Sequence, residues 1–327
     1  MTVATSGRGP RVVVLAGGVG GSTFTAGVRD EVAARAGALT VVCNTGDDLW
    51  LSGLRIQPDV DSMLYALADV KDRIRGWGRA GDSTRVSAEL HAWGVGWDWF
   101  ELGDLDLGAH IARTSWLREG LTPTEVLARL QARWQLGATL LPMTDAEVDT
   151  HVVLPDGTRL HFQEWWTRHR ARLEPEGFEN AGIDTAPPAS GVVEAIRAAD
   201  AVLIAPSNPI VSIGPILAVP GIAQAVREST APVVGVSPII GGAPVRGMAD
   251  VCLRVAGVPC TAAGVAGQYG SRAHDGVLDH WLIGEEDAAE CDTVAATGVV
   301  AHVEPLWMSD AARTRALAVA ALRAAGI

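Results

Sequence analysis

The sequence comprises 327 residues, of which 48% are hydrophobic, and its formal net charge at pH 7 is −12. A chain of this length and apolar content can form one large α/β domain, or a domain that carries a sizeable insertion. The acidic balance argues against broad binding of nucleic acids or of anionic membranes. Lys71 is the single lysine beside many arginines, and we interpret this imbalance as codon bias without chemical meaning.

The cysteines and the apolar runs indicate a cytoplasmic protein. Cys43, Cys252, Cys260 and Cys291 show no Cys-x-x-Cys spacing, which predicts neither a disulfide framework nor a zinc site. No apolar run is long enough to cross a bilayer, so we expect no membrane association. Residues 1–10 are small and polar and lack the apolar core of a signal peptide, so we expect a flexible tail.

The first predicted strand leads directly into a glycine-rich turn. Val12 to Ala16 form an unbroken apolar run, as expected for a buried parallel strand. The turn consists of Gly17, Gly18, Val19, Gly20 and Gly21. Glycines between a strand and a helix allow backbone N–H groups to converge on a phosphate. Ser22 and Thr23 then lead into a helix that we expect over 24–36.

Two common kinds of glycine-rich turn are excluded. The chain has no Gly-x-x-x-x-Gly-Lys motif, so the turn is not a P-loop. The nicotinamide dinucleotide fingerprint needs a third glycine where Thr23 stands, and an acidic residue where Asn44 follows the second predicted strand, 39–43. The turn therefore indicates a nucleotide or diphosphate ligand, with a purely structural turn as the alternative.

Three aspartates follow the second strand. Asp47 and Asp48 lie in a polar loop over 44–58, and Asp61 lies near the start of a helix predicted from about residue 59. Carboxylate oxygens beside a phosphate site are typical ligands of Mg²⁺. We therefore expect Asp47, Asp48 and Asp61 to bind Mg²⁺ or to act as a general base. The alternative for Asp61 is stabilisation of the helix N-terminus through the macrodipole.

Residues 75–190 interrupt the alternation of strands and helices, and we interpret them as an inserted cap or lid. A helix is predicted over 104–119, and Thr122 begins a capping box for the next helix. Pro155-Asp156-Gly157 predicts a hairpin between 148–154 and 158–162. Residues 174–190 are rich in Pro, Gly and acids and resemble a linker.

The last third of the chain returns to the strand and helix alternation. Strands are predicted at 201–205, 232–236 and 298–303, and a closing helix begins at Asp310 with Ser309 as its N-cap. Strands separated by helices predict an α/β fold, a Rossmann-like parallel sheet with helices on both faces. The nucleotide-binding core is then formed by 11–74 and 191–327.

Ligands of such sheets collect at the carboxyl ends of the strands. This rule places the glycine turn beside the loops that follow three other strands. The polar candidates in those loops are Asn44, Thr45, Asp47, Asp48, Ser207, Asn208, Pro209 and Ser237. Ser207 and Asn208 offer hydrogen bonds to a phosphate or a ribose, and the alternative is that Ser-Asn-Pro only caps a turn.

The aromatic residues of the middle region give a weaker indication. Trp93, Trp97 and Trp99 can stack on a flat heterocycle, but tryptophans are also common in core or lid packing. The histidines form neither a triad nor a metal-binding spacing, so no catalytic role is assigned to them.

Together these motifs resemble the 2-phospho-lactate transferase family (CofD-like), which makes the deazaflavin coenzyme F-420. The matching segments are Leu15–Gly21, Asn44–Asp48, Pro58–Asp61 with Tyr65, Trp99–Asp104, Arg113–Thr114, Leu141–Asp145, Pro206–Pro209 with Ser212–Pro215, and Val236–Gly242. They follow the family's order across most of the chain. One departure is Arg246-Gly247-Met248, where the family typically has Gly-Pro.

The resemblance implies a specific transfer reaction. A guanosine diphosphate donor carries a lactyl or enolpyruvyl group on its distal phosphate, and the ribityl hydroxyl of the deazaflavin Fo attacks that phosphate. GMP leaves, and the product is coenzyme F-420-0 or its dehydro form. Bacterial members of the family resemble users of the enolpyruvyl donor.

The resemblance also implies roles for individual residues. The amides of Gly18 to Gly21, with Ser207 and Asn208, would hold the phosphates, and the aspartates would bind Mg²⁺. Trp99, Met143 and Thr144 would cover the deazaflavin.

Two other interpretations remain open at this point. A non-catalytic regulator that binds nucleotide sugars would carry a similar glycine turn and need no deazaflavin pocket. An NAD-dependent dehydrogenase is disfavoured by the missing third glycine and the missing ribose-binding acid. Whichever function applies, a homodimer is the expected assembly, because two-fold dimers are the commonest oligomers.

Overall fold

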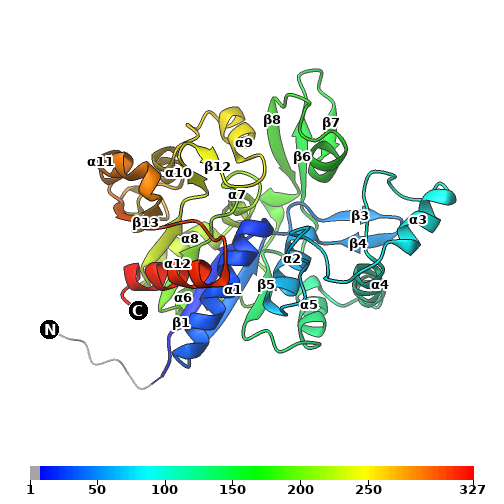
Figure 1. Ribbon diagram of the computed structural model, residues 1–327, viewed down its shortest axis with the longest axis horizontal. Coiled ribbons are helices and arrows are strands. Elements are labelled where there is room, and N and C mark those ends of the chain that lie inside the picture. Colours follow the sequence, from blue (N-terminus) through cyan, green and yellow to red (C-terminus); the bar gives the residue numbers. More distant parts are fainter. Residues whose placement is uncertain (1–7) are drawn as a thin grey trace.

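A computed structural model describes residues 8–327 of the chain. Its centre is a seven-stranded sheet with the order β14-β13-β10-β9-β1-β2-β5 (Figure 1). All neighbouring strands in this sheet are parallel. The strands are β1 (Arg11–Ala16), β2 (Ala38–Cys43), β5 (Thr139–Pro142), β9 (Ala201–Ile204), β10 (Val233–Val236), β13 (His280–Ile283) and β14 (Val300–Val303). The predicted Rossmann-like parallel sheet is confirmed.

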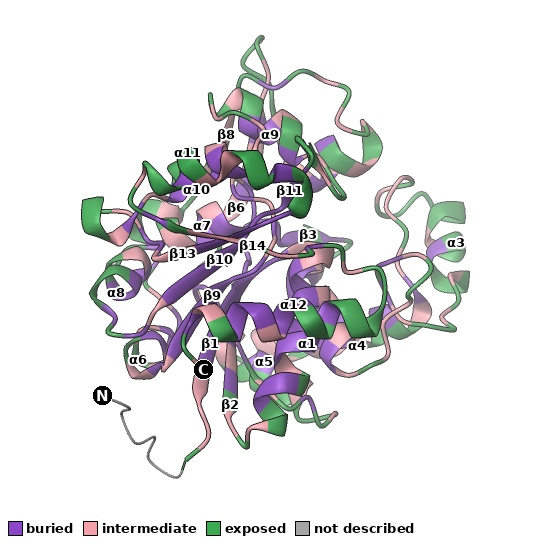
Figure 2. Cartoon of the chain, turned by 60° about the vertical axis from the view of Figure 1, so that its left-hand side comes forward, coloured by how far each residue is buried: buried purple, intermediate pink, exposed green. Residues whose placement is uncertain are grey.

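Helices cover both faces of the sheet because the central strands are apolar on both sides. In β1, Val12 and Val14 belong to one buried cluster, whereas Val13 and Leu15 belong to the other. The first cluster includes residues of α1 (Gly18–Ala34), α2 (Pro58–Leu67), α5 (Pro123–Gln131) and α12 (Ala311–Ala324). The second includes residues of α6 (Val192–Ala198), α7 (Ile213–Ala218), α8 (Ile222–Glu228), α9 (Ala249–Val255), α10 (Ala262–Tyr269) and α11 (Cys291–Ala295). Figure 2 shows the buried strands between these two layers.

Smaller elements extend the core at the periphery. Figure 1 shows the β3–β4 hairpin, α3 and α4 projecting on one side, and the β6–β8 sheet projecting separately. Their bounds are β3 (Leu49–Leu51), β4 (Leu54–Ile56), α3 (Arg85–Ala92), α4 (Asp104–Arg118), β6 (Asp149–Val153), β7 (Arg159–His161), β8 (Gly177–Ala181), β11 (Ile239–Ile240) and β12 (Ala243–Pro244). Short 3₁₀ or π turns cover Glu164–Arg168, Ile183–Thr185, Arg272–His274 and Glu285–Glu290.

The order of the strands fixes where a ligand is expected. The chain moves from β1 outward to β2 and β5, and later adds β9, β10, β13 and β14 on the other side of β1. The direction of winding therefore reverses between β1 and β9. In open parallel sheets the crevice outside the carboxyl ends of the strands at such a reversal is the usual binding place. The glycine turn after β1 and the loop after β9 meet there.

Several local predictions agree with the structure. Thr122 forms the predicted capping box with Glu125 at the start of α5. β6 and β7 form the predicted antiparallel hairpin. The closing helix is present, although its N-cap is Asp310 and not Ser309, because the Asp310 carboxylate accepts from the Arg313 N–H at 2.8 Å.

Other boundaries differ from the prediction. The region 75–190 is not a separate insertion, because its strand β5 pairs with β2 as the edge of the central sheet. Residues 174–190 contain a strand, β8, which pairs with β6. α1 begins at Gly18, inside the glycine turn, so the expected helix over 24–36 starts too late. Of the predicted flexible tail 1–10, residues 1–7 lie outside the described part, and Arg8 pairs with Asp200 at 3.2 Å.

Within residues 8–327, no helix combines the length and the apolar character that a membrane span requires.

Candidate functional site

The glycine turn is braced by a serine from the neighbouring strand. The Ser207 hydroxyl donates to the Gly17 carbonyl at 2.7 Å and accepts from the Gly17 N–H at 3.1 Å. Ser207 is buried and both of its contacts are with the turn. Sequence reasoning gave Ser207 a phosphate-binding role, whereas the structure uses its hydroxyl to tie the end of β9 to the end of β1.

Glycine is needed in this turn because other groups approach its backbone closely. A Cβ at Gly20 would lie 2.8 Å from the Pro206 carbonyl oxygen, and a Cβ at Gly21 would collide with the Ser207 hydroxyl. Gly18 adopts a φ of +65°, a left-handed conformation that favours glycine. α1 starts at this residue, and its N-cap residue Gly17 supplies no side-chain cap, although the Gly18 N–H faces the Asp59 carboxylate. The amides that follow Gly18 are therefore available to an anion.

Asp59, which the sequence analysis did not select, lies at this helix N-terminus. Its carboxylate would collide with a Cβ at Gly17, and it accepts from the Asn44 amide at 2.9 Å. Burial raises the pKa of Asp59, while the Asn44 amide and the Gly18 N–H oppose that rise. Asp59 follows Pro58 at the first turn of α2, and this position among the matching motifs was the only signal for it.

Asp47 and Asp59 form a pair of buried carboxylates. The Asn44 amide group lies between them and also contacts the Asp47 carboxylate at 3.4 Å. Gln163 donates to the other Asp47 oxygen at 2.8 Å. Burial and, next, the charge of Asp59 raise the pKa of Asp47 well above its usual value. Neither carboxylate has an Arg, Lys or His within ion-pair distance in residues 8–327, and only the more distant charge of Lys71 opposes the rise in the pKa of Asp59.

Asp61 does not join this pair, so the structure does not bring the predicted trio of Asp47, Asp48 and Asp61 together. Its carboxylate is held by the Arg113 guanidinium, with one contact at 3.1 Å and a second shorter one. His110 lies 3.6 Å from the same carboxylate. In the described part of the chain, no three His, Cys, Asp or Glu side chains are arranged to hold a metal by themselves. Asp59 and Asp61 are two positions apart, about 200° around a helix, so they face different directions.

Asp48 connects the carboxylate pair to a cavity. Gln57 donates to its Oδ2 at 2.6 Å, and the Arg55 guanidinium lies 3.6 Å from the same atom. Its Oδ1 is buried and has no hydrogen-bond partner among the described residues. Burial raises the pKa of Asp48 to about 7, against the opposing effects of Arg55 and Gln57.

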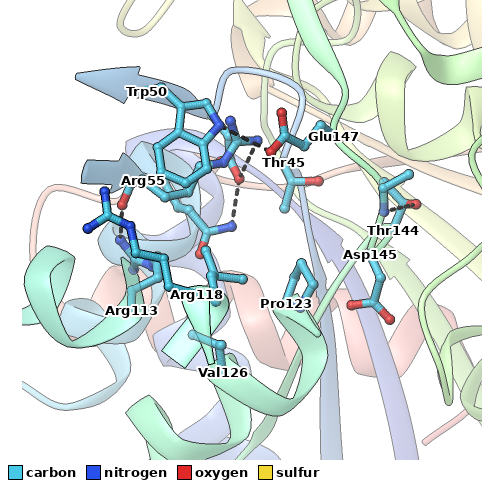
Figure 3. A pocket seen from close by; sticks show the side chains of 14 residues that line it. Thr45, Trp50, Arg55, Arg113, Arg118, Pro123, Val126, Thr144, Asp145 and Glu147 are labelled. Atoms are coloured by element: carbon cyan, nitrogen blue, oxygen red, sulfur yellow. Dashed lines mark hydrogen bonds and ion pairs between the residues drawn. The ribbon is translucent and has the colours of Figure 1, made fainter. Parts of the chain in front are cut away.

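The cavity has a volume of about 260 Å³, and its lining includes three arginines and three acidic residues. In Figure 3, Arg55, Arg113 and Arg118 lie on one side, and Thr144 and Asp145 lie on the other. The Trp50 indole donates to the Glu147 carboxylate at 3.1 Å. The lining residues are Thr45, Asp48, Trp50, Arg55, Gln57, Arg113, Leu117, Arg118, Pro123, Val126, Thr144, Asp145, Ala146 and Glu147. Of these, Thr45, Asp48 and Thr144 were predicted from the sequence as site residues. Arg113 was noted only within a matching segment, and Arg55 and Arg118 were not noted.

Three predicted ligand residues have hydrogen bonds or packing contacts within the protein. The Asn208 side chain accepts from the Ile210 N–H at 2.9 Å, which makes it the turn cap of the alternative interpretation. The Ser237 hydroxyl donates to the Ile239 carbonyl at 2.8 Å and is buried. Pro209 belongs to the same turn as Asn208, and its carbonyl packs against Gly214.

Met143 and the tryptophans also differ from the predicted lid. Met143 is fully buried in the core on one face of the sheet. Trp97 and Trp99 stack on each other with ring centroids 4.4 Å apart. Trp93 is 76% exposed at the end of α3 and is not part of that stack. Trp97 packs against the β3–β4 hairpin, Trp99 stacks on Trp97, and neither tryptophan lines the cavity.

Comparison with known proteins identifies the family to which the chain is similar. The family described as "2-phospho-L-lactate transferase CofD" matches residues 12–325. A phosphoenolpyruvate transferase of Nocardia farcinica is 48% identical over 325 residues, which cover 98% of this chain and 96% of the relative. One from Thermobifida fusca is 50% identical over 321 residues, covering 95% of this chain and 97% of the relative.

Solved structures support the fold. A protein of the UPF0052 family from Bacillus halodurans matches with a TM-score of 0.63 at 19% identity, covering 95% of this chain and 98% of the other. At this identity the similarity shows the fold alone. The family match and the named relatives favour an enzyme over the non-catalytic regulator. The chain therefore belongs to the CofD family, and it is a transferase.

Proposed function

We propose that this protein transfers a phosphoenolpyruvyl group, or its phospholactyl counterpart, from a guanosine-diphosphate-activated donor to the deazaflavin Fo. The family belongs to the F-420 pathway, and the curated relatives carry the name phosphoenolpyruvate transferase. That name favours the enolpyruvyl donor. The observation that carries the proposal is the buried Asp47–Asp59 pair between the start of α1 and the cavity.

The donor diphosphate fits the beginning of α1. The amides that follow Gly18 receive no cap from the N-cap residue, and a helix N-terminus favours an anion. Two neighbouring carboxylates without a cation within ion-pair distance are a suitable donor set for Mg²⁺, which commonly uses one or two carboxylates together with substrate phosphates. Asp47 and Asp59 would hold the ion, and when bound it neutralises charge on the diphosphate.

The acceptor fits the cavity. Its wall combines Trp50 with the guanidinium groups of Arg55 and Arg118, which suit a flat polar heterocycle. Asp48 lies in the same wall, with its Oδ1 unpartnered among residues 8–327. Asp48 is therefore the proposed acceptor of the hydroxyl proton.

The reaction is a substitution at phosphorus. The ribityl hydroxyl oxygen of Fo forms a bond to the distal phosphorus of the donor, and its proton passes to Asp48. The bond between that phosphorus and the oxygen that bridges to the guanosine phosphate breaks. GMP leaves with the bridging oxygen and its electron pair, and (dehydro) coenzyme F-420-0 remains. The protein contributes positioning and charge stabilisation.

The test is direct product detection. Purified protein is mixed with Mg²⁺, Fo and either the enolpyruvyl or the lactyl donor, and the phosphodiester product is sought by mass. We expect product with at least one donor and none after chelation of the metal. Folded protein that gives no product with either donor would reject the proposal.

A titration of Fo fluorescence separates the transferase from the regulator. The transferase should bind Fo saturably, whereas a nucleotide-sugar regulator should not respond. The homodimeric assembly and the cytoplasmic location remain predictions.

A further inference from the structure

Lys71, which the sequence analysis treated as codon bias, is directed at the beginning of α1. Its Nζ donates to the Ser22 hydroxyl at 2.9 Å. Ser22 is fully buried, and its hydroxyl in turn donates to the Val19 carbonyl at 3.0 Å. The only lysine ammonium of the chain is thus fixed against the first turns of the helix that follows the glycine turn.

Lys71 has unused hydrogen-bonding capacity at this position. An ammonium group carries three donors, and the contact to Ser22 uses one. No carboxylate lies within ion-pair distance of Lys71 in the described part of the chain. A partly buried ammonium with free donors and no paired acid is suited to binding an anion, because burial of an unpaired charge is costly.

A second cation lies close to Lys71. Arg246 follows the short β11–β12 hairpin, and its guanidinium lies against the backbone of Gly76, where a Cβ would collide with it. Among residues 8–327, Arg246 forms no ion pair. Burial and the charge of Arg246 lower the pKa of Lys71 to about 8, and the charge of Asp59 opposes this. Arg246 is also the residue at which the sequence departs from the family pattern.

We propose that Lys71 and Arg246 bind the distal phosphate of the guanosine diphosphate donor. This rests on the proposed function. Lys71 Nζ contacts Ser22 of α1, and the Arg246 guanidinium lies at Gly76, in the segment that follows Lys71. Two neighbouring cations are stabilised by a bound anion. The distal phosphate is the natural occupant, because it is the reacting group and belongs at the start of α1, where the Asp59 carboxylate approaches Gly17 and Lys71 contacts Ser22. The two segments that carry Lys71 and Arg246 are far apart in the sequence, so donor binding would join them.

The test compares GDP with GMP by calorimetry in the presence of Mg²⁺. Lys71→Met should weaken GDP binding roughly tenfold to a hundredfold, as expected for a lost charge-assisted contact, and should change GMP binding less than twofold. Lys71→Arg should restore most of the GDP affinity. Arg246→Met should have the same selectivity as Lys71→Met. Arg197→Met is the matched control, because Arg197 is an exposed cation on α6 that pairs with Glu228.

A second measurement uses the unmodified protein. Lys71 is the single lysine, so trinitrobenzenesulfonate labelling of its peptide, followed by mass spectrometry, reports one site. GDP should slow this labelling strongly, and GMP should not.

The possible results decide between the alternatives. Unchanged GDP affinity in Lys71→Met, or equal weakening of GDP and GMP, would overturn the proposal. Selective loss of GDP binding together with absence of product from Fo would support the phosphate site and reject the transfer reaction, so the two proposals fail separately.

Discussion

Arg113 donates two hydrogen bonds to the carboxylate of Asp61, and this ion pair is buried between α4 and α2. The Arg113 side chain is completely inaccessible to solvent, and one of the two contacts measures 3.1 Å. Arg113 also donates to the Arg55 carbonyl at 3.3 Å, which joins the pair to the β3–β4 hairpin. Asp61 is therefore part of the scaffold behind the cavity, and Asp59 takes the position beside the glycine turn.

We predict that Asp61→Asn mainly destabilises the fold. The substitution leaves the buried Arg113 charge without its partner, and such losses cost about 3–5 kcal/mol. Urea unfolding followed by circular dichroism measures the change. Glu228→Gln is the control, because it removes one partner of the exposed Arg197 pair and should leave the unfolding midpoint unchanged. A stable Asp61→Asn protein without activity would instead favour the metal role that the sequence suggested.

Asp47→Asn and Asp59→Asn, in contrast, should reduce turnover without destabilising the fold. Each removes one of two neighbouring buried carboxylates that repel each other, so folding stability should stay equal or rise. Turnover should fall by roughly 10²-fold or more, because charge on the reacting phosphate loses its compensation. Steady-state kinetics at several Mg²⁺ concentrations check this, and a raised Mg²⁺ requirement is expected. Normal turnover in both variants would exclude the pair from the active site.

Ser207→Ala should loosen the glycine turn. The Gly17 N–H and carbonyl would lose their buried partner, which costs about 1–3 kcal/mol. GDP affinity should fall with stability, because the turn positions the first amides of α1. Thermal unfolding and calorimetry measure both effects. Ser309→Ala, at an exposed serine before α12, should change neither; equal effects of the two substitutions would contradict the bracing role.

Acid sensitivity should depend on His110. Burial lowers the pKa of His110 to about 4, below its ordinary value of 6.5, and the Arg113 guanidinium lies 2.9 Å from its Nδ1. Between these values the unfolded chain takes up a proton that the folded protein does not. This stabilising contribution is therefore complete above pH 6.5 and is lost as the pH falls toward 4, by about 3 kcal/mol.

The variant His110→Asn cannot take up this proton. Its free energy of unfolding should fall less than that of the original protein over the same pH range. Denaturant titrations at pH 7, 6, 5 and 4 make the comparison. Parallel pH profiles for the two proteins would show that His110 does not contribute.

Local sequence patterns determined the class of fold and much of its framework. The apolar runs of β1, β2, β9 and β10, the capping box at Thr122 and the hairpin around Gly157 are each encoded within a few neighbouring residues. Their periodicity and turn chemistry do not depend on distant contacts. The glycine turn was likewise recognisable, because it follows a buried strand directly and leads into a helix.

The tertiary structure decided which side chains form the site. The sequence could not show whether Asp59 or Asp61 faces the glycine turn, because the rotation of α2 about its axis is set by packing against α1 and the sheet. Several site contacts join positions that are far apart in the chain. Gln163 binds Asp47, and Lys71 binds Ser22. Such convergence depends on long-range packing, which leaves no periodic signal in the sequence.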